Sequence, residues 1–142
     1  VLDIFAGTGA MGLEALSRGA AEAVFIDRTT SDIIRKNAER CHMSGQVKVI
    51  ARDVTPALKL LGGKSFDYIF MDPPYRKGYI NEILKEILSC GICSDDAIIV
   101  AEHSVSEAPD LSLFEDRLDL WKEKKSGAIV VTYLRCRTTE GV

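Results

Sequence analysis

Hydrophobic and polar positions along this chain follow two alternating patterns, short runs of β-branched apolar residues and longer amphipathic stretches. The apolar runs have the length and composition of buried strands, and the amphipathic stretches have the period of helices. At 79–89, for example, Ile80, Ile83, Leu84 and Ile87 recur on one helical face. The predicted strands are 1–5, 23–27, 47–51, 66–71, 97–101, 117–122 and 128–134, and the predicted helices are 10–18, 31–43, 56–61 and 79–89.

The order of these elements predicts the fold. Five strands alternate with helices, which indicates parallel strands with right-handed crossovers, and therefore a doubly wound sheet. The last two strands flank KEKKSG at 122–127, too short for a crossover helix, so they are expected to form an antiparallel hairpin. The expected architecture is a three-layer α/β/α domain over 1–142, with a mostly parallel seven-stranded sheet. Because Val1 already lies inside a strand, a segment before it is expected to be missing.

Local signals refine the predicted boundaries. Gly19 suits a left-handed cap at the end of the first helix. The stretch TPAL suggests Thr55 as an N-cap, with Pro56 at the first helical position. The segment 103–116 is too irregular to form a long helix.

Four aspartates mark one edge of the predicted sheet, because a ligand of an open α/β sheet binds beyond the C-terminal strand ends. Asp3, Asp27, Asp53 and Asp72 lie in or just after the first four strands. We therefore expect four carboxylates to converge beside the loop that follows the first strand.

That loop, GTGAMG at 7–12, has the glycine spacing of a dinucleotide-binding turn. Asp27 lies 20 positions after Gly7, as expected for an acid that binds a ribose. Asp3 fits a pyrophosphate poorly, because a buried carboxylate is costly unless it is paired. A cationic ligand without phosphate, such as S-adenosyl-L-methionine, would justify Asp3. The alternative is that Asp3 caps a neighbouring turn.

The stretch FDYIFMDPPYRKG at 66–78 places an acid, two prolines and a tyrosine after an apolar strand. The prolines fix φ and remove two N–H donors, which leaves a rigid turn rich in acceptors. Asp72 and the Pro73 carbonyl could accept both hydrogens of a planar NH2 group, while Tyr75 stacks on it. This arrangement favours methyl transfer to an amine; the alternative is an ordinary Pro-Pro turn that ends a strand.

These stretches resemble class I methyltransferases that carry a (D/N)PP(Y/F) motif. More narrowly, VLDIFAGTGAMGLEALSRGA, VFID and MDPPY are similar to the RsmD family of small-subunit (16S) ribosomal RNA guanine-N2 methyltransferases. The resemblance implies a Rossmann-like class I methyltransferase fold and S-adenosyl-L-methionine as cofactor. It implies ribosomal RNA or the small ribosomal subunit as partner, and a cytoplasmic location.

The resemblance also implies roles for individual residues. Asp3 would meet the methionine ammonium, Asp27 the ribose hydroxyls and Asp53 the adenine amino group. Asp72, Pro73 and Tyr75 would hold the target guanine. The remaining cofactor contacts would be Ala6, Gly7, Thr8 and Gly9 at the methionine moiety, and Arg28 and Val54 at the adenine.

The net charge and the positions of basic residues bear on whether the chain binds nucleic acid. A net charge of −3 argues against tight autonomous binding of nucleic acid, although a local basic patch remains compatible with it. Lys122, Lys124 and Lys125, with Arg76 and Lys77, are either phosphate contacts or a solvated hairpin and loop.

The hydropathy of the chain and its cysteines argue against several classes of protein. No apolar run reaches the roughly 18 residues of a membrane helix, and four scattered cysteines make no disulfide framework. Cys90 and Cys93 close a helix, unlike a redox motif, and no further pair of ligands completes a zinc site, so no metal is expected.

Three other functions stay open. A DNA adenine-N6 methyltransferase would share the DPPY chemistry, but 142 residues leave no space for a target-recognition region. An NAD-dependent oxidoreductase would use GTGAMG and leave MDPPY without a role. A non-catalytic module that binds the cofactor or RNA would not need Asp72 or Tyr75.

Overall fold

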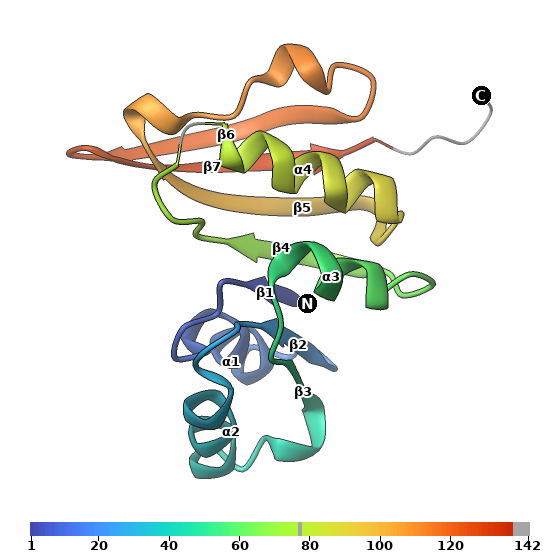
Figure 1. The fold of residues 1–142 in the computed structure, drawn as a ribbon, viewed down its shortest axis with the longest axis vertical. Helices are drawn as coiled ribbons and strands as arrows, with labels where there is room; N and C mark the ends of the chain where they lie inside the picture. Colours follow the sequence, from blue (N-terminus) through green and yellow to red (C-terminus); the bar gives the residue numbers. More distant parts are fainter. Residues whose placement is uncertain (77, 138–142) are drawn as a thin grey trace.

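A seven-stranded sheet in the order β3-β2-β1-β4-β5-β7-β6 runs through the computed structural model, which describes residues 1–76 and 78–137 (Figure 1). Strands β1 to β5 pair in parallel with one another, whereas β7 pairs antiparallel with both β5 and β6. The predicted doubly wound sheet and its C-terminal hairpin are thus confirmed. The strands are β1 (Leu2–Ile4), β2 (Ala23–Ile26), β3 (Val47–Ile50), β4 (Phe66–Met71), β5 (Cys93–Ser104), β6 (Leu118–Ser126) and β7 (Ile129–Cys136).

Two helices pack on each face of the sheet. Successive residues of a strand point to opposite faces, so Phe25 of β2 packs with α1 and α2, whereas Ile26 joins the core beneath α3 and α4. Among the described residues, no helix combines the length and hydrophobicity needed to cross a bilayer. The helices are α1 (Ala10–Ser17), α2 (Ser31–Arg40), α3 (Val54–Leu60) and α4 (Tyr79–Cys90).

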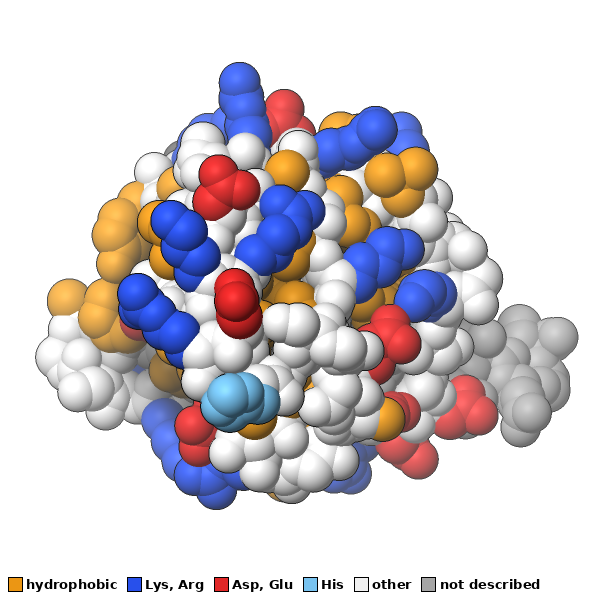
Figure 2. Space-filling model, turned by 90° about the horizontal axis from the view of Figure 1, so that it is seen from below, with side chains coloured by type: hydrophobic (Ala, Val, Ile, Leu, Met, Phe, Trp, Pro, Cys, Tyr) orange, Lys and Arg blue, Asp and Glu red, His pale blue; other side chains and the backbone are white. Residues whose placement is uncertain are grey.

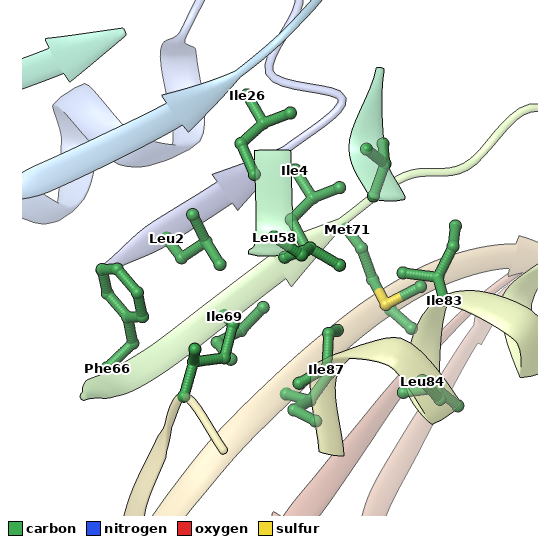
Figure 3. Packing of buried hydrophobic residues seen from close by; sticks show 14 of the residues in the cluster. Leu2, Ile4, Ile26, Leu58, Phe66, Ile69, Met71, Ile83, Leu84 and Ile87 are labelled. Atoms are coloured by element: carbon green, nitrogen blue, oxygen red, sulfur yellow. The ribbon is translucent and has the colours of Figure 1, made fainter. Parts of the chain in front are cut away.

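The larger part of the core lies between the sheet and the pair α3 and α4. Figure 3 shows Leu2 and Ile4 of β1 beside Leu58 of α3, with Ile87 of α4 close to β4. These four side chains are fully buried. Each contributes about 1.5–3 kcal/mol relative to an exposed side chain, so this core holds the strand ends in register and thereby positions the loops that follow them.

Some predicted boundaries are wrong, and the physical reasons are local. Helix α3 begins at Val54 with Asp53 at the N-cap position, so Thr55 is not the cap and Pro56 is the third helical residue. A proline is tolerated there because N–H groups of the first turn have no acceptor inside the helix. Strand β5 extends from 93 to 104 instead of 97 to 101, because β4 and β7 offer it partners along that length.

Other local predictions are confirmed. Gly19 follows α1 with φ 111°, in the region that favours glycine, and its N–H donates to the Leu16 carbonyl at 3.1 Å. The segment 103–116 forms no long helix; it contains two short 3-10 turns, at 105–107 and 111–113.

Gly12 lets helix α1 approach the sheet closely. A Cβ atom at this position would lie 2.4 Å from Cε1 and 2.6 Å from Cζ of Phe25, a ring that is fully buried. The third glycine of GTGAMG is therefore required by packing between helix and strand.

We expect Gly12→Ala to lower the free energy of unfolding by about 1–3 kcal/mol, because overpacking outweighs the higher helix propensity of alanine. Urea unfolding measures the change. Gly45→Ala is the matched control, since nothing lies within 4 Å of its Cβ position. Phe25→Leu should recover part of the loss in the double variant; a Gly12→Ala protein as stable as the wild type would contradict the packing argument.

Candidate active site

A groove of about 760 Å3 lies at the C-terminal ends of the parallel strands. Its lining includes five of the predicted site residues: Asp27, Arg28, Asp53, Val54 and Asp72.

A hollow of about 880 Å3 lies elsewhere, between α1 and β4 and beside Val1, and none of the predicted site residues lines it. The chemistry expected from the sequence therefore belongs to the smaller groove.

Asp3 lies in the centre of β1 and does not line the groove; only 4% of its surface is exposed. Its Oδ2 accepts a hydrogen bond from the N–H of Gly12 in the first turn of α1, at 3.0 Å. The pKa of Asp3 is raised to about 7, chiefly by burial; the Gly12 N–H acts to lower it, and the carboxylates of Asp27 and Asp72 add to the rise. Asp3, Asp27 and Asp72 therefore form one cluster of interacting negative charge.

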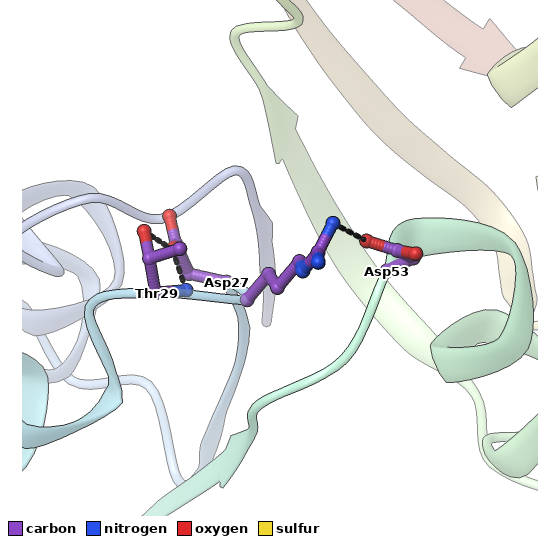
Figure 4. Close-up of polar contacts among 4 residues, drawn as sticks. Asp27, Thr29 and Asp53 are labelled. Atoms are coloured by element: carbon purple, nitrogen blue, oxygen red, sulfur yellow. Dashed lines mark hydrogen bonds and ion pairs between the residues drawn. The ribbon is translucent and has the colours of Figure 1, made fainter.

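Asp27 follows β2 and ties two loops together. Its Oδ2 accepts from the N–H of Gly7 at 2.9 Å, and its Oδ1 accepts from the N–H groups of Thr29 and Thr30 at 3.0 and 3.1 Å (Figure 4 draws the Thr29 contact). Although partial burial acts to raise it, these hydrogen bonds hold the pKa of Asp27 below its usual value. Asp27 is thus ionised at the rim of the groove.

The glycine loop presents few free donors to a phosphate. A dinucleotide-binding turn offers its N–H groups and the N-terminus of its helix to a pyrophosphate, but here the N–H groups of Gly7 and Gly12 already donate to Asp27 and Asp3. Of the predicted loop contacts, Gly9 is the N-cap of α1. The Ala6 N–H donates to Ile26, and the Thr8 carbonyl accepts from Asn37. Two of the donors that a pyrophosphate would use are therefore already occupied.

Arg28 and Asp53 both line the groove and form an ion pair; Figure 4 labels Asp53 and marks this contact with a dashed line. Nη1 of Arg28 lies 3.5 Å from Oδ1 of Asp53, and both side chains are mostly exposed. An exposed ion pair of this length contributes little to stability, about 0–1 kcal/mol. A planar ligand can therefore separate the two side chains at low cost. Val54, by contrast, is buried beneath them.

The DPPY turn leaves the sheet where β4 ends. Asp72 lines the groove, and partial burial raises its pKa. Pro74 also lines the groove, whereas the predicted Pro73 is buried. Tyr75 is 68% exposed and does not line the groove. The structure thus brings Asp72 to the other acids and leaves the Tyr75 ring accessible from solvent.

Sequence reasoning missed an aromatic contact beside Asp72. Phe5, whose φ of 60° lies in the left-handed region, packs edge to face on Tyr79 with the ring centroids 5.8 Å apart. The guanidinium of Arg76 lies 3.9 Å from the Tyr79 centroid and 3.4 Å from Glu82. No sequence pattern marked Tyr79 as a site residue, because the pattern of a helix does not show which loop the first turn of that helix contacts. Lys77, predicted beside Arg76 as a basic residue, lies outside the described residues.

Comparison with known proteins gives consistent matches. Residues 1–135 match the family model described as Conserved hypothetical protein 95. Ribosomal RNA small subunit methyltransferase D of Escherichia coli (strain K12) is 35% identical over 130 residues, which cover 90% of this chain and 64% of that protein. The chain thus spans less than two thirds of the length of this curated relative.

Solved structures agree in fold. The protein yhhF from Escherichia coli matches with a TM-score of 0.83 and 31% identity, over 97% of this chain and 75% of that chain. An RNA methyltransferase from Salinibacter ruber, solved in complex with S-adenosyl-L-homocysteine, matches with a TM-score of 0.71 over 99% of this chain and 81% of that chain. At 17% identity the second match shows the fold alone. The fold is the Rossmann-like fold of methyltransferases.

Proposed function

The chain belongs to the RsmD family, whose model carries the description Conserved hypothetical protein 95, and from that premise we propose that it transfers a methyl group from S-adenosyl-L-methionine to RNA. The acceptor in this proposal is an exocyclic base amine, the N2 of a guanine in small-subunit ribosomal RNA. One observation carries the proposal: Asp27 and Asp72 line the groove beside the DPPY turn, and both carboxylates act on the buried Asp3. The name of the Escherichia coli relative supports the choice of RNA.

The residues of the groove fit this cofactor. The three interacting carboxylates would offset the ammonium and sulfonium charges, and two loop N–H groups that a pyrophosphate would need donate to aspartates. In the proposal Asp3 binds the ammonium, and the loop of Ala6, Gly7, Thr8 and Gly9 lies along the methionine moiety. Asp27 accepts from the ribose hydroxyls, while Arg28, Asp53 and Val54 hold the adenine.

The bound cofactor supplies an electrophilic methyl group on sulfur. The chain must then hold the acceptor amine in line with it, because the nitrogen lone pair is delocalised into the base ring. Asp72 and the Pro73 carbonyl accept the two N–H hydrogens, and Tyr75 stacks on the base. A new N–C bond forms as the C–S bond breaks, and the amine releases one proton.

Partial desolvation makes Asp72 a stronger acceptor, although its side chain is exposed to solvent. Desolvation raises the pKa of this carboxyl, so the ionised form takes a hydrogen bond or a proton more readily than an ordinary aspartate. Positioning of the amine and electrostatic stabilisation of this kind lower the activation barrier by several kcal/mol. The target base must be unpaired or flipped out to reach Asp72.

Mass mapping of ribosomal RNA nucleosides tests the proposal. We expect small ribosomal subunits from cells without this protein to lack one N2-methylguanosine, and purified protein with S-adenosyl-L-methionine to restore it. Subunits with unchanged nucleosides would contradict the proposal. Methyl transfer to duplex DNA but not to subunits would favour the adenine-N6 alternative. In calorimetry, tight NAD binding without S-adenosyl-L-methionine binding would favour the oxidoreductase.

A further inference from the structure

The C-terminal hairpin carries a cluster of cations on aromatic rings. Trp121 and Tyr133 pack edge to face, with centroids 6.1 Å apart and an interplanar angle of 89°. Nζ of Lys122 lies 4.6 Å from each of these two centroids, and Nζ of Lys124 lies 5.9 Å from that of Tyr133. The guanidinium of Arg135 lies 5.3 Å from the Trp121 centroid. We call these five residues the hairpin cation cluster.

Strand register places the two lysines on one face of the sheet. Lys122 is opposite Tyr133 and Lys124 is opposite Val131, and residues directly opposite in an antiparallel pair share a face. Glu123 is opposite the buried Thr132 on the other face, where it pairs with Lys125 at 3.6 Å. The carboxylate nearest in sequence therefore does not neutralise the two lysines.

The rings hold these cations without cancelling their charge. A cation over an aromatic face is attracted by the ring quadrupole, but the ring carries no net charge. Asp119, which is opposite Arg135, is hydrogen-bonded to the guanidinium of Arg137, and the charge of Arg135 acts on it more weakly. Glu102 of β5 and Lys124 of β6 both pair with Val131 of β7, which lies between them. Glu102 is therefore on the same face of the sheet as Lys124, but two strands away. The hairpin thus keeps a local excess of positive charge in a chain whose net charge is −3.

One end of the cluster, at Lys124, reaches the sheet edge that carries the groove. The strand register aligns four residues across neighbouring strands. Met71 of β4 pairs with Ala101 of β5, Ala101 pairs with Thr132 of β7, and Thr132 pairs with Glu123 of β6. Asp72 and Lys124 each lie one residue further toward that edge. Neighbouring strands are about 4.8 Å apart, so Lys124 lies about 14 Å from Asp72 along the sheet. In Figure 1 the arrowhead of β4 and the closed end of the hairpin lie at the same side.

We propose that the hairpin cation cluster binds the phosphate backbone of the RNA strand that flanks the methylated base. This inference rests on the proposed function, because it takes a polyanion that emerges from the groove as the partner. A base held at Asp72 leaves its neighbouring nucleotides outside the groove, and cations about 14 Å away suit phosphates of those neighbours. Trp121, which is 50% exposed, adds a surface on which a flanking base can stack.

The double variant Lys122→Gln/Lys124→Gln tests the inference in binding to a ribosomal RNA fragment. Fluorescence anisotropy measures the dissociation constant from about 50 to about 200 mM salt. We expect affinity to fall at least about tenfold at low salt, and the slope of log K against log salt to fall by about 1–2, as for one or two lost phosphate contacts. Lys122→Arg/Lys124→Arg, which keeps the charges, should bind nearly as the wild type does.

Lys36→Gln/Lys48→Gln is the matched control, with the same loss of charge at α2 and the edge strand β3. Figure 2 views the molecule from that end, where Lys and Arg side chains lie among Asp and Glu. The control should change affinity less than about twofold. Equal weakening by both double variants would indicate general attraction and overturn the inference. An unchanged affinity and salt slope in the hairpin variant would also overturn it.

A kinetic measurement separates this inference from the proposed function. The hairpin variant should raise KM for the RNA at least about tenfold with kcat unchanged, because it loses binding remote from the reacting atoms. If the wild type methylates the RNA but the hairpin variant keeps its KM, the inference alone fails. If the wild type binds no S-adenosyl-L-methionine and transfers no methyl group, the proposed function fails, whatever the RNA affinities are.

Discussion

Replacing Asp72 with alanine should lower the rate of methyl transfer about a thousandfold, while the dissociation constant of S-adenosyl-L-methionine changes less than about tenfold. The carboxylate lies at the groove where β4 ends, and partial desolvation raises its pKa. Its proposed partner is the acceptor amine, so its removal affects the reacting substrate more than the cofactor. Single-turnover methylation and calorimetry measure the two quantities.

Asp95→Ala is the control for this experiment, because it removes an exposed carboxylate near the opposite end of the sheet, at the start of β5. It should leave both quantities unchanged. A loss of cofactor affinity as large as the loss of rate in Asp72→Ala would assign Asp72 to cofactor binding instead. Full activity of Asp72→Ala would reduce the DPPY turn to a structural feature.

Replacing Asp3 with asparagine should weaken S-adenosyl-L-methionine binding at least about a hundredfold at about pH 8. Opposite charges about 4 Å apart attract by roughly 4 kcal/mol at an effective dielectric constant near 20, before desolvation. Asparagine keeps an oxygen that can accept from the Gly12 N–H, so the loss isolates the charge. Calorimetry measures the affinity, and an unchanged value would return Asp3 to the role of a turn cap.

The same substitution should stabilise the protein without cofactor. The pKa of Asp3 is about 7 in the folded state against 3.8 for an ordinary aspartate, a difference of roughly 4 kcal/mol at 1.36 kcal/mol per unit. The folded state therefore holds the Asp3 proton more tightly than the unfolded state does. The free energy of unfolding consequently falls as pH rises from about 4 to about 7. At about pH 8 the wild type bears the full cost and Asp3→Asn does not.

Urea unfolding of both proteins across this pH range checks the linkage. We expect Asp3→Asn to be the more stable protein at about pH 8 by up to roughly 4 kcal/mol, with the difference shrinking toward about pH 4. A constant difference at all pH values would show that Asp3 does not titrate with a raised pKa. In the wild type, cofactor affinity should fall as pH drops below about 7, because a protonated Asp3 no longer offsets a cation.

Prediction from the sequence succeeded where a signal is local. The runs at 23–27 and 66–71 became β2 and β4 almost to the residue, because apolar composition and flanking polar residues define a buried strand. The end of each strand then located Asp27 and Asp72. It failed at α3, because the TPAL signal did not show that the helix begins two residues earlier. It also missed Phe5 and Tyr79, which meet only when the loop after β1 approaches α4.

The linear pattern was therefore sufficient for the order of strands and helices and for the sheet edge that carries the aspartates, because each depends on neighbours in the chain. Folding decided which distant groups touch. It placed the Gly12 N–H against Asp3, the Phe25 ring against Gly12, and the hairpin cations on Trp121 and Tyr133. Such contacts depend on helix docking and strand register, in which residues far apart in sequence approach within a few ångströms, and no local pattern encodes those distances.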